Sequence, residues 1–218
     1  MRIVEPDFAR MIDLPGVSPC PRPVDIDQSV TGFSNLRSLR VYTFACDKII
    51  DGEAEEDELF IVLLSGTVDV LVAGASTASF TLQTGSGTGA VYLPPHDSYR
   101  LRVRSDADVA YARAQPGNND SKMARAFDYV DGRLAVIDYS DSFSIALSAQ
   151  GVGNDRFLST LGSSAAERLI HIRCNDSEAI CVAGQSLHNW QTLALDRGDP
   201  GEIGPAGDST TVFIVAAA

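Results

Sequence analysis

Histidine is the side chain most used for metal binding and proton transfer near neutral pH, and this 218-residue chain contains His96, His171 and His188. No two of them are separated by a single residue, so no HxH pair can point two imidazoles from one strand face at a metal ion. On an expected strand, His171 shares a face with Leu169 and Arg173. If that face is interior, its polar groups need a bound partner; if it is exterior, nothing about function follows.

A polar and aromatic group, His188 with Trp190, stands just before another expected strand. Trp190 could stack on the face of a sugar ring while His188 supplies a proton or a hydrogen bond, although a core tryptophan beside a turn fits the same pattern. His171 and His188 could meet across neighbouring strands and hold a metal together with Glu167 or Glu178. Nothing in their spacing requires this arrangement.

Tyr99 begins a further expected strand, on which Arg100 and Arg102 share the opposite face. If Tyr99 points inward, its phenol could bind a sugar hydroxyl; a barrel tyrosine that bonds to the backbone is the alternative. His96 is followed by Asp97 in an expected turn, where the carboxylate could orient the ring. A surface histidine in a turn explains the same two residues.

Five acidic side chains lie between Glu53 and Glu58, and carboxylates are ligands for Mg²⁺, Ca²⁺ or Mn²⁺. Five adjacent acids cannot all converge on one ion, so we expect a solvated loop here. The glycine-rich segment from Thr84 to Ala90 lacks the Lys-Ser/Thr ending of a phosphate loop and the GxGxxG order of a dinucleotide fold. We therefore expect a flexible turn there.

The amino-acid composition disfavours some classes of binding partner. With 17 basic and 29 acidic side chains the formal charge is −12, which disfavours binding to nucleic acid or to an anionic membrane surface. No run approaches the roughly 18 apolar residues of a spanning helix, and the first residues lack the apolar core of a signal peptide. We expect a cytoplasmic protein in which the widely spaced cysteines are buried free thiols.

Alternating and continuous apolar runs predict a protein made mostly of strands. The central feature is a hairpin in which a buried strand, Leu59 to Leu64, turns at Ser65-Gly66 into an alternating strand, Thr67 to Val72. Further strands are predicted at 36–44, 78–82, 90–93, 99–103, 109–112, 134–138, 143–147, 169–174, 179–182, 191–195 and 211–215. Short helices are predicted at 8–12 and 122–129. The proline-rich run near the N-terminus is expected to lie outside any regular ladder.

With these strands placed, the first half resembles the cupin superfamily. Cupins carry two signature segments. The first has a glycine, an HxH pair, a glutamate and a glycine, and it aligns with residues 52–66. The second has a glycine, a proline and a later histidine, and it aligns with residues 89–99. Within that superfamily, ELFIVLLSGTVDVLVAG and GAVYLPPHDSYRLRV look like the N-terminal barrel of the 5-deoxyglucuronate isomerase family, two-barrel proteins of inositol catabolism. The resemblance covers roughly residues 35–115.

This resemblance implies a divalent metal held by several histidines and a glutamate in the C-terminal barrel. In the first barrel, the two histidine positions fall at Glu53 and Glu55, or at Gly52 and Ala54 in the other register, and the late histidine falls at Tyr99. The histidine metal site is therefore absent from the first barrel, and no metal ligand is assigned, although a divalent metal elsewhere stays open.

We predict an all-β, two-barrel (bicupin) protein of β-barrel or jelly-roll type with few short helices. Its predicted parts are an arm at 1–31, a degenerate cupin barrel at 32–115, a linker at 116–127 and a shortened barrel at 128–218, and we expect a homodimer. One hypothesis is a sugar-acid isomerase, with His171, His188 and Glu178 as catalytic residues and Tyr99, Arg173 and Trp190 as substrate-binding residues. The other is a metal-free, non-catalytic cupin that binds a small carbohydrate or a protein.

Overall fold

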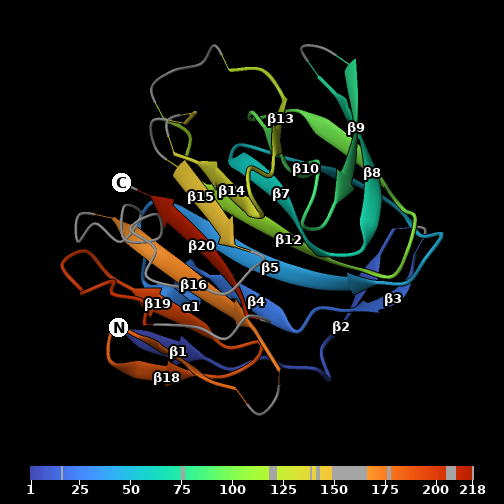
Figure 1. The fold of residues 1–218 in the computed structure, drawn as a ribbon. Helices are drawn as coiled ribbons and strands as arrows, with labels where there is room; N and C mark the ends of the chain where they lie inside the picture. The colour runs from blue at the N-terminus through green and yellow to red at the C-terminus, as the bar shows by residue number, and fades with distance from the viewer. Residues whose placement is uncertain are drawn as a thin grey trace.

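The computed structural model describes residues 1–15, 17–74, 77–117, 122–137, 139–140, 143–148, 166–175, 178–204 and 210–217. These residues form strands and one four-residue helix, α1 (Gln28–Thr31), which confirms the all-β prediction (Figure 1). In the part of the chain that the structure describes, no helix is long and apolar enough to cross a membrane.

One large curled sheet forms the first barrel. Its strand order is β4-β5-β12-β7-β10-β9-β8-β11-β6, with β13 paired to β10. The strands are β4 (Val24–Asp27), β5 (Leu36–Phe44), β6 (Ile49–Glu53), β7 (Glu58–Ser65), β8 (Thr67–Ala73), β9 (Thr77–Gln83), β10 (Thr88–Leu93), β11 (Ser98–Val103), β12 (Ala107–Ala114) and β13 (Arg125–Asp128).

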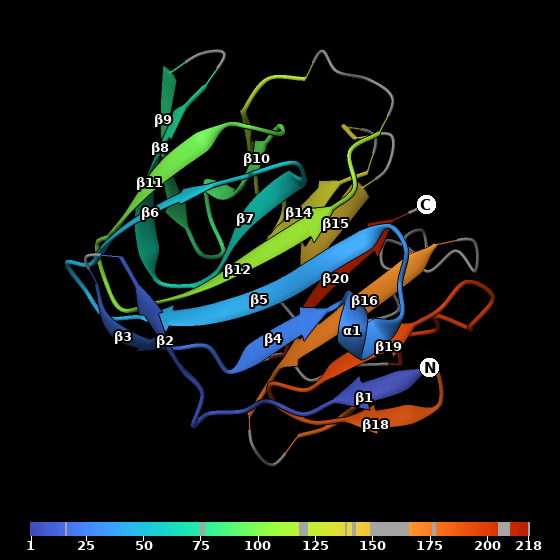
Figure 2. The ribbon, with the colours of Figure 1, turned by 180° about the vertical axis from the view of Figure 1, so that it is seen from behind.

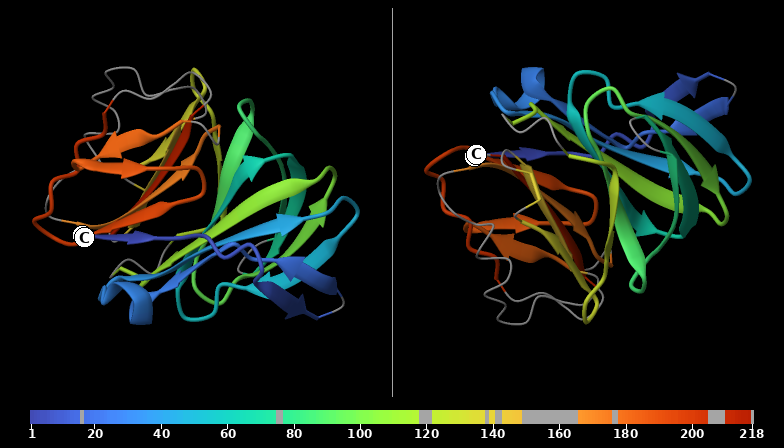
Figure 3. Two further views of the ribbon diagram at one scale, coloured as in Figure 1. Left: turned by 90° about the horizontal axis from the view of Figure 1, so that it is seen from below. Right: turned by 90° about the horizontal axis from the view of Figure 1, so that it is seen from above.

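A second sheet, which we call the second unit, packs beside the first barrel (Figure 3). It has the order β1-β19-β16-β20-β15-β14, and a small hairpin, β17–β18, packs on it. Its strands are β1 (Arg2–Val4), β14 (Arg133–Val136), β15 (Phe143–Ser148), β16 (Glu167–Arg173), β17 (Ile180–Val182), β18 (Gln185–Leu187), β19 (Thr192–Leu195) and β20 (Thr211–Ala217).

The predicted hairpin at the centre of the first barrel is present as β7 and β8. Its turn requires a glycine: Gly66 has a φ of +91°, and a Cβ there would lie 2.3 Å from the carbonyl oxygen of Asp106. Strand β7 is apolar at almost every position because both of its faces are buried. Phe60 and Val62 face the second unit, whereas Leu59 and Ile61 face the barrel interior.

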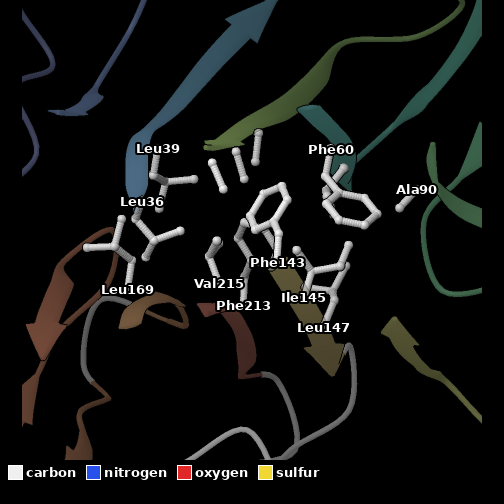
Figure 4. Close-up of a cluster of buried hydrophobic side chains, with 14 of the residues drawn as sticks. Leu36, Leu39, Phe60, Ala90, Phe143, Ile145, Leu147, Leu169, Phe213 and Val215 are labelled. Carbon is white, nitrogen blue, oxygen red and sulfur yellow. The ribbon is translucent and has the colours of Figure 1, made fainter. Parts of the chain in front are cut away.

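The cluster between the two β units is thus the largest apolar contact that joins them (Figure 4). Phe60 of β7 lies 4.9 Å from Phe143 of β15, measured between ring centroids. Strand β20 is shared in the same way as β7, since Phe213 and Val215 join this cluster while Val212 and Ile214 fill the second unit. Burial of both faces explains why such strands read as continuous apolar runs.

Both predicted helices are wrong, and so is the expectation that the proline-rich run lies outside any regular ladder. The helix predicted at 8–12 is replaced by a turn and then by β2 (Met11–Leu14), which forms a hairpin with β3 (Val17–Pro21) from the proline-rich run (Figure 2). The helix predicted at 122–129 is replaced by β13. Strand β9 pairs with β10 at a single described position, Thr88 with Leu82, so the rest of that edge is free to pair with β13. Tertiary pairing thus overrides the local propensity.

The predicted division into arm, two barrels and linker stays a prediction, but three strands cross its boundaries. Strand β4, from the predicted arm, pairs with β5 of the first barrel. Strand β1, from the predicted arm, pairs with β19 of the second unit. Strand β13, from the predicted linker, pairs with β10 of the first barrel. Residues 118–121 of the predicted linker lie outside the described residues, as do residues 149–165 of the predicted second barrel.

Candidate functional site

The structure brings His171, Arg173 and Trp190 together between the two β units, as an inter-unit joint that also includes Asp108 of β12. On β16, Leu169 packs into the cluster between the units, and His171 and Arg173 lie on the same strand face. His171 therefore faces the first barrel, on the outside of the second unit, and not the interior of a barrel.

His171 is fully buried in this joint. Its Nδ1 lies 3.0 Å from the hydroxyl of Thr192, and its ring packs edge-on against Trp190 at 5.9 Å between centroids. Burial, with a smaller effect of the Arg173 charge, lowers the pKa of His171 to about 3. The imidazole is therefore neutral at physiological pH, and a neutral ring avoids charge repulsion with Arg173.

Arg173 covers the face of Trp190. Its guanidinium carbon lies 3.6 Å from the centre of the indole ring, and its Nη1 lies 2.9 Å from an Asp108 carboxylate oxygen. Asp108 also accepts hydrogen bonds from the hydroxyls of Thr43, at 2.7 Å, and Ser65, at 2.9 Å. Arg173 thus occupies one face of the indole on which a sugar could have stacked, and these contacts connect the second unit to β5, β7 and β12.

His188 and Glu178 lie in other surroundings. His188 is exposed in the turn before β19, and its backbone N–H donates to the Gln191 side chain at 2.8 Å. Glu178 accepts from the Asn175 amide at 3.5 Å and from the Thr210 hydroxyl at 3.4 Å. The catalytic roles of His171, His188 and Glu178 stay predictions.

The interior of the second unit tests the metal that the resemblance implies. Among the described residues, no group of three histidine, cysteine, aspartate or glutamate side chains could hold a metal ion. The hydrophobic side chains that fill this interior are aliphatic: Ala146, Ile170, Ile172, Ile180, Val182, Leu187, Leu193, Leu195, Val212, Ile214 and Ala216. Arg168 is also fully buried, on the same face of β16 as Ile170, but a guanidinium group only donates hydrogen bonds and is no metal ligand. Aliphatic side chains offer no metal ligand, so these residues do not fit the implied metal.

The first barrel, in contrast, opens into a cavity of about 180 Å³, which we call the phenol pocket. Three tyrosines from three strands line it: Tyr42 of β5, Tyr99 of β11 and Tyr111 of β12. The charged side chains at its wall include Arg40, Arg113, Glu53 and Glu55, and Leu14 of the β2–β3 hairpin closes one side. Among the predicted substrate-binding residues, Tyr99 is the one that lies here.

The register of β6 decides between the two alignments of the missing histidines. Ile50 and Ala54 are part of the barrel core, so Gly52 shares their inward face and Glu53 points outward. Gly52 pairs with Tyr99 across β6 and β11, and a Cβ at Gly52 would lie 2.4 Å from the Tyr99 hydroxyl oxygen and 2.5 Å from its Cζ. The tyrosine ring thus fills the space that a histidine at Gly52 would need, and this barrel does not fit a metal either.

Burial holds the phenols of Tyr99 and Tyr111 in their protonated form. Burial raises the pKa of Tyr99 to about 12, and burial, with a smaller contribution from Tyr99, raises the pKa of Tyr111 well above its usual range. Tyr42 accepts a hydrogen bond from Arg22 at 3.0 Å. Arg113 donates to the backbone carbonyls of residues 53 and 54 and so fixes the end of β6 beside the pocket.

A second set of contacts holds the pocket wall on the side of β4 and β5. Asp25 of β4 accepts from Arg22 at 2.7 Å and from Arg40 at 3.2 Å, and it also binds Arg10. Because Arg10 and Arg22 flank the β2–β3 hairpin, Asp25 ties that hairpin to the strand that carries Arg40 and Tyr42.

The remaining sequence candidates have structural explanations. His96 is exposed in a turn, with Nε2 3.9 Å from Glu56. In the acidic run, Glu58 is buried and accepts from the Tyr92 hydroxyl at 2.9 Å, and no metal-binding group of three forms among the described residues. All four cysteines are free, but the expectation that they are buried is wrong for Cys46 and Cys181, which are exposed.

A curled antiparallel sheet with a ligand-sized cavity at its mouth defines a cupin-type β-barrel. The model of the KduI/IolB family matches residues 22–131, about half of the chain, and the chain belongs to this family. A search of curated proteins found no match.

Solved structures show the same fold at low identity. An IolB-like protein from Salmonella typhimurium is 15% identical, covers 90% of this chain and 89% of its own, and has a TM-score of 0.63. The protein YlbA from Escherichia coli is 11% identical over 99% of this chain and 90% of its own, with a TM-score of 0.68. The E. coli pirin YhhW, solved in complex with nickel(II), is 15% identical over 99% and 98%, with a TM-score of 0.62.

Sequence reasoning missed most of the pocket. It predicted the strand at 36–44 that carries Arg40 and Tyr42 but gave these residues no role, and it assigned nothing to Tyr111 or Arg113. The available signal was the alternation of Tyr111 and Arg113 along β12, which puts both on one face. That alternation does not reveal which strand lies next to β12, so it could not bring these residues to Tyr99.

Proposed function

We propose that this protein is a sugar-isomerase-like cupin that binds a small sugar acid in the phenol pocket. The observation that carries the proposal is the pocket itself, in which three aromatic rings are combined with guanidinium and carboxylate groups. Small-ligand sites are typically concave and largely apolar, with a few placed polar groups that fix orientation. Membership of the KduI/IolB family supports a sugar ligand.

The charged groups match a polyhydroxylated acid. Guanidinium groups such as Arg40 donate to carboxylate oxygens, and a carboxylate such as Glu55 accepts from sugar hydroxyls. For isomerisation, a base must remove a proton beside the substrate carbonyl, and Glu55 is a carboxylate at the pocket wall that could serve. Tyr99 belongs to this site as a substrate-binding residue.

A second candidate function is binding without turnover. It is favoured by the aliphatic interior of the second unit, since the implied metal chemistry has no ligands there among the described residues. The proposal also includes that the protein is a cytoplasmic homodimer that binds neither nucleic acid nor membranes. Sedimentation velocity measures the oligomeric state.

Titration calorimetry with D-glucuronate and D-glucose, in the presence of EDTA, tests the proposal. We expect D-glucuronate to bind more tightly than the neutral sugar, and Arg40→Gln to weaken D-glucuronate binding by about tenfold through loss of a charged hydrogen bond. The control is Arg102→Gln, on the exposed face of β11. Equal binding by wild type and Arg40→Gln, or binding that disappears with EDTA, would overturn it. NMR in D₂O distinguishes turnover from binding, because an isomerase would exchange the sugar proton beside the carbonyl for deuterium and a binding protein would not.

A further inference from the structure

The hydroxyl of Tyr111 has no hydrogen-bond partner among the described residues, although it is buried. Tyr111 as a whole is 5% exposed and lines the phenol pocket. The Tyr99 hydroxyl is close enough to affect the pKa of Tyr111, but no hydrogen bond of normal geometry joins them. Buried polar groups are nearly always paired, and leaving one unpaired costs stability. An orphan donor at a cavity wall therefore indicates a partner that occupies the cavity.

The neighbouring phenols differ from Tyr111 in how they are used. The ring centroid of Tyr42 lies 5.4 Å from that of Tyr111, and the Tyr42 hydroxyl is already paired with Arg22. The ring of Tyr99 lies 5.8 Å from Tyr111 and stands over Gly52. Tyr111 and Tyr99 thus present two protonated phenols on the inward side of the barrel mouth.

The cupin resemblance would put metal-binding histidines on this inward side of the barrel mouth. The way in which a metal ion holds a ligand oxygen can therefore be compared with the way in which the two phenols would hold it. A bound metal accepts lone pairs from a ligand oxygen, and a protonated phenol attracts the same lone pairs by donating a hydrogen bond. We infer that Tyr111 and Tyr99 form a metal-free oxygen-binding site, which holds a carboxylate or carbonyl oxygen of the ligand. The inference rests on the proposed function, because it assigns the ligand oxygen within the same pocket.

The size of the pocket limits what it encloses. An apolar cavity of roughly 150 Å³ holds a benzene molecule, and the phenol pocket has about 180 Å³. The pocket can therefore enclose roughly six to eight non-hydrogen atoms by the same comparison. That is the carboxylate end of a sugar acid with its neighbouring carbons, while the remainder of the sugar extends from the mouth.

The variant Tyr111→Phe tests the assignment because it removes only the hydroxyl. A hydroxyl that serves the ligand should weaken D-glucuronate and acetate binding by about tenfold when lost, while the ligand-free protein stays as stable as wild type or becomes more stable. The matched control is Tyr92→Phe, whose buried hydroxyl already donates to Glu58 outside this pocket. That variant should lose stability and keep the affinity.

The outcomes separate the inference from the proposed function. If Tyr111→Phe binds D-glucuronate like wild type while Arg40→Gln binds it weakly, the inference is wrong and the proposed function stands. A stability loss like that of Tyr92→Phe also overturns the inference, because the hydroxyl would then be structural. If acetate binds in a Tyr111-dependent manner but no sugar acid binds, the inference stands and the proposed function fails.

Discussion

Replacing Gly52 with alanine should destabilise the protein through one identified contact. The added methyl would lie 2.4 Å from the Tyr99 hydroxyl oxygen, 2.5 Å from Cζ and 2.9 Å from Cε1, closer than carbon and ring atoms approach in folded proteins. Tyr99 is packed against the core of the first barrel, and its ring lies beside Tyr111, so its freedom to move away is limited.

The magnitude follows from two effects of opposite sign. Overpacking of this kind costs about 1–3 kcal/mol of unfolding free energy. Gly52 does not have a positive φ, so alanine itself should gain about 0.4–1 kcal/mol at such a position by restricting the unfolded chain. Gly52→Ala should therefore destabilise wild type but become neutral or stabilising in a Tyr99→Ala background, with a coupling energy equal to the overpacking cost of about 1–3 kcal/mol.

Urea unfolding of the four proteins, followed by tryptophan fluorescence and circular dichroism, measures this cycle. Tyr99→Phe is the matched control, because it keeps Cζ and Cε1 and should preserve most of the cost of Gly52→Ala. An equal effect of Gly52→Ala in the wild-type and Tyr99→Ala backgrounds would refute the reasoning that the tyrosine ring occupies the space of a side chain at residue 52.

Two further predictions concern the inter-unit joint. Since the pKa of His171 is about 3 when folded and near 6.5 when unfolded, the unfolded state binds an extra proton between these values. The stability that the neutral ring contributes is complete above pH 6.5 and is lost as the pH falls, by up to about 1.4 kcal/mol per unit. His171→Asn, which can still bond to Thr192, should show a shallower decline between pH 7 and 5 in urea unfolding, and an unchanged slope would contradict the burial argument. Arg173→Gln should cost roughly 2–4 kcal/mol because it leaves the Asp108 charge without its ion-pair partner. Adding Asp108→Asn should recover part of this loss, whereas strict additivity would mean that the pair is not coupled.

The sequence predicted those strands whose determinants are local. The β7–β8 hairpin follows from an apolar run, a Ser-Gly turn and an alternating run, and all three signals lie within about fifteen residues of one another. Strand β13 could not be predicted because it depends on a free edge of β10, and short strands such as β1 depend on a distant partner, β19. Edge pairing is a tertiary effect that local patterns do not contain.

Only those features of the candidate site that depend on local sequence could be predicted. The loss of the HxH pair and the placement of Tyr99 at the late histidine follow from counting residues along the chain. The face of His171 could not be assigned from the sequence, because both faces of β16 mix apolar and charged side chains and both are buried. The meeting of Tyr42, Tyr99 and Tyr111 depends on how β5, β11 and β12 curl around one cavity, which no spacing within a single strand can show.

A crystal structure of EDTA-treated protein soaked with D-glucuronate tests the central claim most directly. We predict ligand density in the phenol pocket, with a carboxylate or carbonyl oxygen within hydrogen-bond distance of the Tyr111 and Tyr99 hydroxyls. Ligand density beside His188 and Glu178 in the second unit, with the phenol pocket empty, would contradict the account.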